Sequence, residues 1–312
     1  MFAPSYTIPY LCQLLGLGFE LSSINYQQKY NRLHRSVYGL SDDLYMLEMI
    51  ISLLLIYCFL NYSFSKLVSE QFCKRFPLFY PLSQLDGNGN QTLIPNKFFS
   101  TNGVLPLYYG LVLFEIAKFI LSLKVLIQLY NYRFTKHVHQ GVSKICFSSI
   151  LFILIFSIFT YCCSIKNLSN NNNMGKFGIF YIEHVNYLWV FANILSTFKF
   201  LPQLVINWEG MCTQGLSSKY VVLQFFSNLF SLFSAFSLNK SLPFYALPFN
   251  QKPMITSFVN LFCVVGLLYQ AQYLYLNKSP YLKRRRNFTS NRIIVHEIPT
   301  NVDEFDTFDT TR

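Results

Sequence analysis

The distribution of apolar residues along the chain is the feature that most constrains its fold. Apolar residues gather into long blocks separated by polar stretches. A bilayer core needs roughly 20 apolar residues for each crossing helix. Five blocks reach that length readily, at about 44–63, 104–130, 142–163, 183–206 and 254–276. Two weaker blocks, about 8–27 and 218–238, carry more polar residues. We therefore predict an all-α membrane protein with seven transmembrane helices.

Composition supports the membrane class and excludes others. Hydrophobic residues make up 52% of the chain and charged residues only 12%, against about 25% charged in soluble domains. This excludes a typical soluble enzyme, a disordered chain and a disulfide scaffold. The eight cysteines show no metal-ligand spacing, so we expect no metal site and no cofactor.

The net charge of +11 has a membrane explanation. The one dense basic run directly follows the last apolar block, which is typical of a cytosolic cluster that contacts anionic lipid. It consists of Lys283, Arg284, Arg285 and Arg286. We expect this lipid contact and no nucleic-acid partner.

Lysines and arginines in the loops predict the orientation. With the N-terminus in the lumen, cytosolic segments hold 14 of these residues and the opposite side holds 8. The excess of positive charge on the cytosolic side favours this topology, with a cytosolic C-terminus. The loop 64–103 is then lumenal, and its sequon at Asn90 is a candidate for glycosylation.

The chain contains an internal repeat. Gln27 aligns with Gln203, and without a gap Gly39 then aligns with Gly215. Each copy starts at the end of one predicted span and runs into the beginning of the next. The copies start four spans apart, and an even offset gives both the same orientation in the membrane. Parallel repeats of this kind are a known plan of transporters.

The repeat divides the chain into two parallel triple-helix bundles joined by a linker helix, a 3+1+3 arrangement. We expect a first repeat, a linker with its flanking loops, a second repeat and a cytosolic, disordered tail. Their bounds are 1–130, 131–182, 183–276 and 277–312.

The second copy carries a family resemblance. Residues 198–203 read Phe-Lys-Phe-Leu-Pro-Gln, followed by Asn207-Trp208 and Gly215-Leu216-Ser217. This pattern resembles the second PQ-loop of the cystinosin-like PQ-loop repeat family. The first copy resembles a degenerate PQ-loop, with Tyr26 where proline is usual. The related SWEET sugar transporters and the KDEL receptor share the seven-helix plan.

Proline and glutamine give the motif a physical role. Pro202 removes a backbone hydrogen bond and kinks its helix, and the freed carbonyl needs a partner inside a membrane. We expect the side-chain amide of Gln203 to be that donor. The resemblance implies that such hinges open the cytosolic gate, and Tyr26 cannot kink its helix in this way. The second repeat is therefore predicted to flex more, unless Pro202 merely marks a helix bend.

Polar residues recur on one face of several predicted spans. Glu20, Ser23 and Gln27 form one such stripe, and a charge inside a membrane must face protein or water. We predict an inward polar cavity that binds the solute. Its candidate residues are Glu48, Glu115, Lys199, Gln224, Asn228 and Asn260. The alternative is that Glu115 pairs with Lys118, or that Lys118 and Lys124 extend to the membrane surface.

One position departs from the family. Proton-coupled, cystinosin-like members carry an aspartate where this chain has Gln224, and glutamine cannot titrate. Glu48 occupies the equivalent place in the first repeat. A buried carboxyl group can hold and release a proton near neutral pH, so Glu48 is the candidate for proton coupling.

The function that the sequence favours is transport of a small, polar, amino-acid-like solute across an endomembrane, with the vacuole or lysosome first and the ER or Golgi second. The resemblance suggests this cationic or zwitterionic solute class. A sorting receptor that binds a lumenal peptide and a sugar facilitator stay open as alternatives on the same fold. No nucleophile–base pair or phosphate-binding glycine loop points to an enzyme.

Overall fold

The structure is a computed structural model and describes residues 7–75, 83–85, 91–93, 107–137, 139–164, 176–238, 248–276 and 278. Three predictions fall on other residues: the glycosylation site at Asn90, the lipid-binding run at 283–286 and the disordered tail. Most of the loop 64–103 also lies outside the described residues.

Helices make up most of the described chain. They are α1 (Thr7–His34), α2 (Asp42–Phe64), α3 (Lys66–Arg75), α4 (Leu111–Asn131), α5 (Lys144–Cys163), α6 (Tyr181–Phe198), α7 (Leu201–Gly210), α8 (Ser218–Ser237) and α9 (Met254–Tyr269). Two short strands, β1 (Ser83–Leu85) and β2 (Gln91–Leu93), pair antiparallel between α3 and α4. Short 3-10 turns lie at Arg133–Thr135 and Lys176–Gly178, and a π turn at Gln270–Leu274 follows α9.

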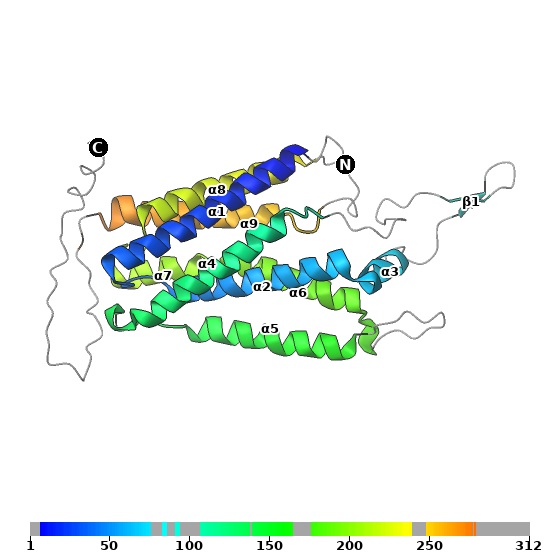
Figure 1. The fold of residues 1–312 in the computed structure, drawn as a ribbon, viewed down its shortest axis with the longest axis horizontal. Helices are drawn as coiled ribbons and strands as arrows, with labels where there is room; N and C mark the ends of the chain where they lie inside the picture. The colour runs from blue at the N-terminus through cyan, green and yellow to red at the C-terminus, as the bar shows by residue number, and fades with distance from the viewer. Residues whose placement is uncertain are drawn as a thin grey trace.

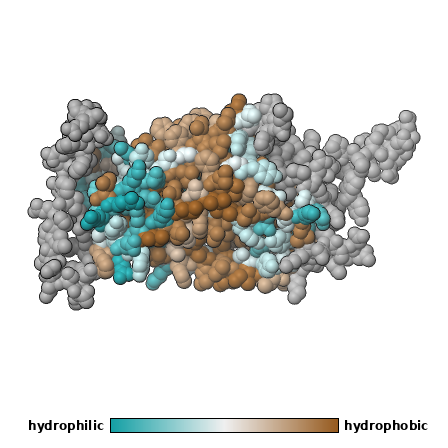
Figure 2. All heavy atoms as spheres, viewed as in Figure 1, coloured by the Kyte–Doolittle hydropathy of each residue, from teal (hydrophilic) through white to brown (hydrophobic). Residues whose placement is uncertain are grey.

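The described part of the chain contains five segments long and apolar enough to cross a membrane. They are Asp42–Phe64, Lys144–Cys163, Tyr181–Gly210, Ser218–Ser237 and Met254–Leu274. The long helices lie side by side, and a belt of hydrophobic residues crosses the middle of the face shown in Figure 2. The predicted all-α membrane class is confirmed.

The two remaining long helices, α1 and α4, run alongside the others in Figure 1. Their 28 and 21 residues correspond to about 42 Å and 31 Å at roughly 1.5 Å per residue, which is enough to cross a hydrocarbon core. Both carry polar and charged side chains that are buried, such as Glu20 in α1 and Lys118 in α4. That these two helices also cross the membrane stays a prediction.

The helices pack as two sets of three. Helix α4 packs against both α1 and α2, and α9 packs against both α6 and α8. Between the sets, α1 packs along α8 and α2 packs along α6. The first helix of each set therefore contacts the second helix of the other set, which is the pattern expected for repeats related by two-fold pseudosymmetry. Helix α5 lies at the outside, against α6 (Figure 1).

Pro202 lies at a break in the helical chain. Helix α6 ends at Phe198 and α7 begins at Leu201, so Pro202 is in the first turn of α7, where its missing N–H leaves no helical hydrogen bond unmade. Helix α1 continues without a break past Tyr26. The second set of helices is therefore broken where the first is continuous, while the greater flexing of the second repeat stays a prediction.

Candidate functional site

Five charged side chains meet inside the bundle. Glu20 comes from α1, Glu48 from α2, Glu115 and Lys118 from α4, and Lys199 from the turn after α6. At most 15% of any of these side chains is exposed. An unpaired charge at this depth in a membrane costs about 3 kcal/mol or more, so the five groups require one another as partners.

The two ammonium groups bridge the three carboxylates. Lys199 Nζ forms an ion pair with Glu20 and lies 2.9 Å from Glu48 Oε2. Lys118 Nζ lies 3.0 Å from Glu115 Oε2, 3.5 Å from Glu48 Oε1 and 3.7 Å from Glu20 Oε2. With all five groups ionised, the cluster keeps one net negative charge. We call these five residues the charge cluster.

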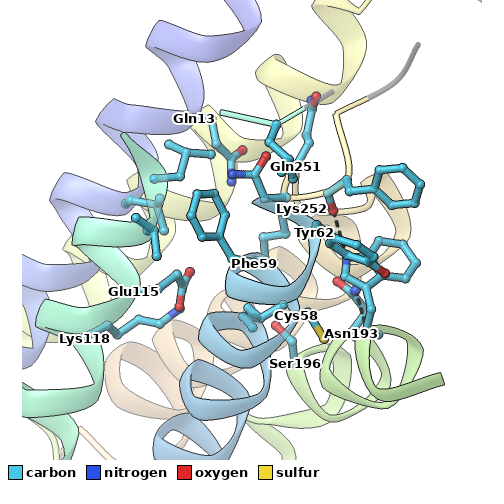
Figure 3. Close-up of a pocket in the computed structure, with 18 of the residues that line it drawn as sticks. Gln13, Cys58, Phe59, Tyr62, Glu115, Lys118, Asn193, Ser196, Gln251 and Lys252 are labelled. Carbon is cyan, nitrogen blue, oxygen red and sulfur yellow. Dashed lines mark hydrogen bonds and ion pairs between the residues drawn. The ribbon is translucent and has the colours of Figure 1, made fainter. Parts of the chain in front are cut away.

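A cavity lies directly beside the charge cluster (Figure 3). Its volume is about 60 Å³, well above the roughly 10–15 Å³ that a single water molecule needs. The first half of α1, the second half of α2, the first half of α4, α6 and the segment before α9 form its wall. It therefore lies toward the end of the bundle where α1 and α4 begin. The charged residues in the wall are Glu20, Glu115, Lys118 and Lys252.

Neutral polar residues lie beside the charge cluster in the interior of the bundle. Gln224 Nε2 donates a hydrogen bond of 2.8 Å to Ser23 Oγ, joining α8 to α1. Asn228 Nδ2 donates to the backbone oxygen of Gln224 at 2.8 Å, and Asn228 Oδ1 accepts from Lys252 Nζ at 2.9 Å. Asn260 in α9 is fully buried, and neither atom of its amide has a hydrogen-bond partner among the described residues.

The opposite end of the bundle is closed by the two motif glutamines. Gln27 Nε2 donates to the oxygen of Gly215 at 2.9 Å, and Gln27 Oε1 accepts from the nitrogen of Ser217 at 2.9 Å. Gln203 makes the equivalent pair with the other repeat, donating to Gly39 O and accepting from Ser41 N, both at 2.8 Å. Each glutamine thus binds the loop of the opposite repeat. We call these four hydrogen bonds the glutamine latch.

Glycine permits the close approach in the latch. A Cβ atom at Gly215 would lie 2.2 Å from the carbonyl carbon of Gly39 and 2.4 Å from the nitrogen of Leu40, far inside normal contact. Gly39 has a φ of +75°, in the left-handed region that favours glycine. The glycine of each copy is therefore needed where the two loops touch.

The prediction for the hydrogen-bond acceptor of the Gln203 side chain was wrong. We expected its amide to bind the carbonyl that Pro202 frees in its own helix. Instead, Gln203 Nε2 donates to Gly39 O in the other repeat and to Asn207 Oδ1, both at 2.8 Å. The physical reason is that Gln203 is fully buried at the contact between the repeats, where the loop of the first repeat offers unpaired backbone groups.

The structure brings together only some of the predicted binding residues. Glu48, Glu115 and Lys199 join the charge cluster, whereas Gln224 and Asn228 form the neutral part beside it and Asn260 lies on α9 without a described partner. The alternative pairing of Glu115 with Lys118 is present, but Lys118 also reaches Glu20 and Glu48.

Sequence reasoning missed three residues of the site. Glu20 was placed on an inward stripe but not in the binding set, and Lys118 was considered mainly as a partner of Glu115. Lys252 was counted only as a loop charge, yet it lies in the cavity wall. Its position two residues before α9 was the available signal, because lysines next to a membrane span often extend along it.

Comparison with known proteins agrees with this architecture. A sequence model of the PQ loop repeat matches residues 185–244, which contain α7 and the second half of the glutamine latch. An uncharacterized protein of Saccharomyces cerevisiae, YCL002C, is 41% identical over 273 residues, covering 87% of this chain and 97% of the relative. Its name assigns no substrate. The chain is an integral membrane protein that belongs to the PQ-loop repeat family.

Proposed function

We propose that the protein transports a small, polar, amino-acid-like solute across an endomembrane. The observation that carries this proposal is the charge cluster beside an interior cavity. Buried ionisable groups inside a membrane are costly and typically line a substrate or ion pathway. A cavity with carboxylates and ammonium groups in its wall suits a solute that is itself charged, either cationic or zwitterionic.

Alternating access supplies the mechanism. The glutamine latch closes one end of the bundle, while the cavity lies toward the other end. For the solute to leave at the latched end, the four hydrogen bonds must break and the two sets of helices must separate there. We propose that Pro202, at the break between α6 and α7, is the hinge of this movement.

The proposed orientation has the N-terminus in the lumen and the C-terminus in the cytosol. The glutamine latch is then the cytosolic gate, and the cavity of this state is on the lumenal side. The excess of lysines and arginines in the predicted cytosolic segments supports this orientation. A vacuolar or lysosomal membrane fits a transporter that moves such solutes between lumen and cytosol.

Two other functions fit less well. A sugar facilitator needs no ionised groups, so the five buried charges would destabilise it without a benefit. A sorting receptor binds a peptide from the lumen without carrying it across the membrane, so it needs no hinge such as the one we propose at Pro202. The charge cluster therefore favours a small ionic solute.

Proton coupling is better assigned to Glu115 than to Glu48. Glu48 lies between Lys199 and Lys118, so two ammonium groups balance its charge. Among the described residues, Glu115 pairs with Lys118 alone, and it lines the cavity with 15% of its side chain exposed. We propose that Glu115 is the group that takes up the coupling proton. Glu48, the candidate from the sequence alone, is the alternative.

Uptake into vesicles tests the function. The purified protein is reconstituted and supplied with labelled amino acids and sugars, with and without a pH gradient. We expect uptake of at least one amino acid and of no sugar. Loss of the pH dependence in Glu115→Gln but not in Glu48→Gln supports the assignment of the proton. Uptake of sugars alone contradicts the proposed solute class.

A further inference from the structure

Lys252 differs from the other two lysines in the interior. Lys118 and Lys199 each contact two or more carboxylates. Among the described residues, the ammonium group of Lys252 has no carboxylate within ion-pairing distance, and its hydrogen bond goes to the neutral amide oxygen of Asn228 at 2.9 Å. Lys252 also lines the cavity. Its positive charge is therefore available to an anionic group in the cavity.

The segment that carries Lys252 is held in place on three sides. Trp189 Nε1 donates to Phe249 O at 2.8 Å, which ties the segment to α6. Asn250 exchanges two hydrogen bonds with the backbone of Tyr108, at 2.7 and 2.9 Å. Gln251 Nε2 donates to Ser234 Oγ in α8 at 3.2 Å. A charged group fixed in this way loses little conformational freedom when a ligand binds.

The cavity wall also offers acceptors that lack donors. Gln13 Oε1 and Gln251 Oε1 are buried without a hydrogen-bond partner among the described residues, and both residues line the cavity. Glu115 adds a carboxylate to the same wall. Figure 3 shows Glu115 projecting from α4 on one side of the cavity, with Gln251 and Lys252 on the segment across from it. Buried acceptors without partners favour an occupant that carries N–H donors.

We infer that Lys252 binds the carboxylate group of the solute, while Glu115 and the free amide oxygens of the wall receive its ammonium group. The solute is therefore a zwitterionic amino acid and not a simple amine or a sugar. This inference rests on the proposed function only in taking the cavity as the solute site, and it adds the group that selects for a carboxylate.

The protonation state of Lys252 agrees with this role. Burial lowers the pKa of Lys252 to about 8, with Glu20 and Glu48 opposing the change and Lys199 and Lys118 adding to it. Lys252 lies outside the membrane-spanning segment that begins at Met254. Its ammonium group is consequently protonated below pH 8, so the charge that binds a carboxylate is present at acidic and neutral pH.

A binding experiment on the full-length protein tests the inference. The protein in lipid nanodiscs is titrated with each standard amino acid, and binding is followed by the rise in melting temperature. Each amino acid that binds is then compared with its amide, which keeps the ammonium group but lacks the carboxylate. We expect the amide to bind at least tenfold more weakly, as the loss of a hydrogen bond to a charged group implies.

Three variants separate Lys252 from its surroundings. Lys252→Gln should lose the preference for the acid over the amide, whereas Lys252→Arg should keep it. Asn228→Asp retains the lysine but gives it a carboxylate within the protein, so this variant should also lose binding. Lys219→Gln is the control, because Lys219 is exposed at the start of α8, and it should bind like the unaltered protein.

The outcomes distinguish this inference from the proposed function. If no amino acid binds, if the amides bind as well as the acids, or if folded Lys252→Gln binds with unchanged preference, the inference is wrong. Folding is checked by the melting temperature without ligand. If Lys252→Gln does not fold, Asn228→Asp tests the inference in its place, and unchanged binding by that variant contradicts it. Selective binding without uptake in vesicles leaves the inference standing and overturns transport. Uptake of a solute that lacks a carboxylate leaves transport standing and overturns the inference.

Discussion

The glutamine latch and the charge cluster lie in different parts of the contact between the two repeats, and they differ in symmetry. In the latch, matching positions carry the same residues: Gln27 and Gln203, and Gly39 and Gly215. Both copies make the same pair of hydrogen bonds with the opposite loop. Two like halves can therefore close one end of the bundle on a shared pseudo-two-fold axis.

In the interior, the same repeat offset aligns unlike residues. Ser23 matches Lys199, and Glu48 matches Gln224. The α1–α8 contact consequently holds a neutral hydrogen bond of 2.8 Å, while the α2–α6 contact holds an ion pair of 2.9 Å. A symmetric interior would present the same groups twice. The asymmetry instead places an ion pair on one side of the interior and a neutral hydrogen bond on the other.

The largest loss of stability is expected when the ion pairs of Lys199 are removed. Lys199→Met leaves Glu20 and Glu48 with one ammonium group fewer, and removing one partner of a buried ion pair costs about 3–5 kcal/mol. Ser23→Ala, at the matching position, removes one neutral hydrogen bond and should cost about 1 kcal/mol. Thermal unfolding in detergent measures both. Equal losses would show that the two contacts do not differ energetically.

A somewhat smaller effect is expected in the latch. Gly215→Ala forces a Cβ atom into the backbone of Gly39, and overpacking of this kind costs about 1–3 kcal/mol, with the upper end expected here because backbone cannot move aside easily. Gly141→Ala is the control, since a Cβ there meets nothing within 4 Å. We expect a lower melting temperature and greater labelling of cysteines at the latched end for Gly215→Ala alone.

The two latch glutamines test the symmetry directly. Gln27→Ala and Gln203→Ala each leave one backbone N–H and one carbonyl of the opposite loop unpaired, which costs about 2 kcal/mol. Because the two sets of hydrogen bonds match in length and partner type, the two variants should be destabilised equally. A difference well above 1 kcal/mol in unfolding experiments would mean that the latch is asymmetric as well.

The smallest effect is a pH dependence that belongs to the asymmetric region. Because the pKa of Lys252 is lowered to about 8, its positive charge is nearly complete at pH 7 and below and is lost as the pH rises through 8. Amino acid binding should therefore weaken by up to tenfold per pH unit above pH 8. Lys252→Arg stays charged and should bind more strongly than the unaltered protein there. Coinciding binding curves for the two proteins would contradict this.

Several features of the fold were predictable from the sequence. The long apolar blocks correctly predicted an all-α membrane protein, and the gapless match of Gln27 with Gln203 led to the family that the comparisons support. The break at Pro202 follows from the geometry of proline alone. The inward stripe that begins at Glu20 was also correct, since Glu20, Ser23 and Gln27 are all buried.

Other features were not predictable. Nothing local indicates that Gln203 binds Gly39, because the two residues are far apart in the chain and the expected donor role in its own helix is equally compatible with the sequence. The same applies to Lys118, whose carboxylate partners come from α1 and α2 as well as from its own helix. A single sequence does not reveal which polar faces meet.

By itself, the sequence determined where the long apolar helices form, where one of them breaks and which polar stripe of α1 points inward, because these properties depend on neighbours within a few turns. The tertiary structure decided which inward residues touch: that α1 packs on α8 and α2 on α6, that three carboxylates share two ammonium groups, and that Lys252 is left without a described carboxylate. The physical reason is that pairing of buried charges depends on distances of a few ångströms between helices distant in the chain.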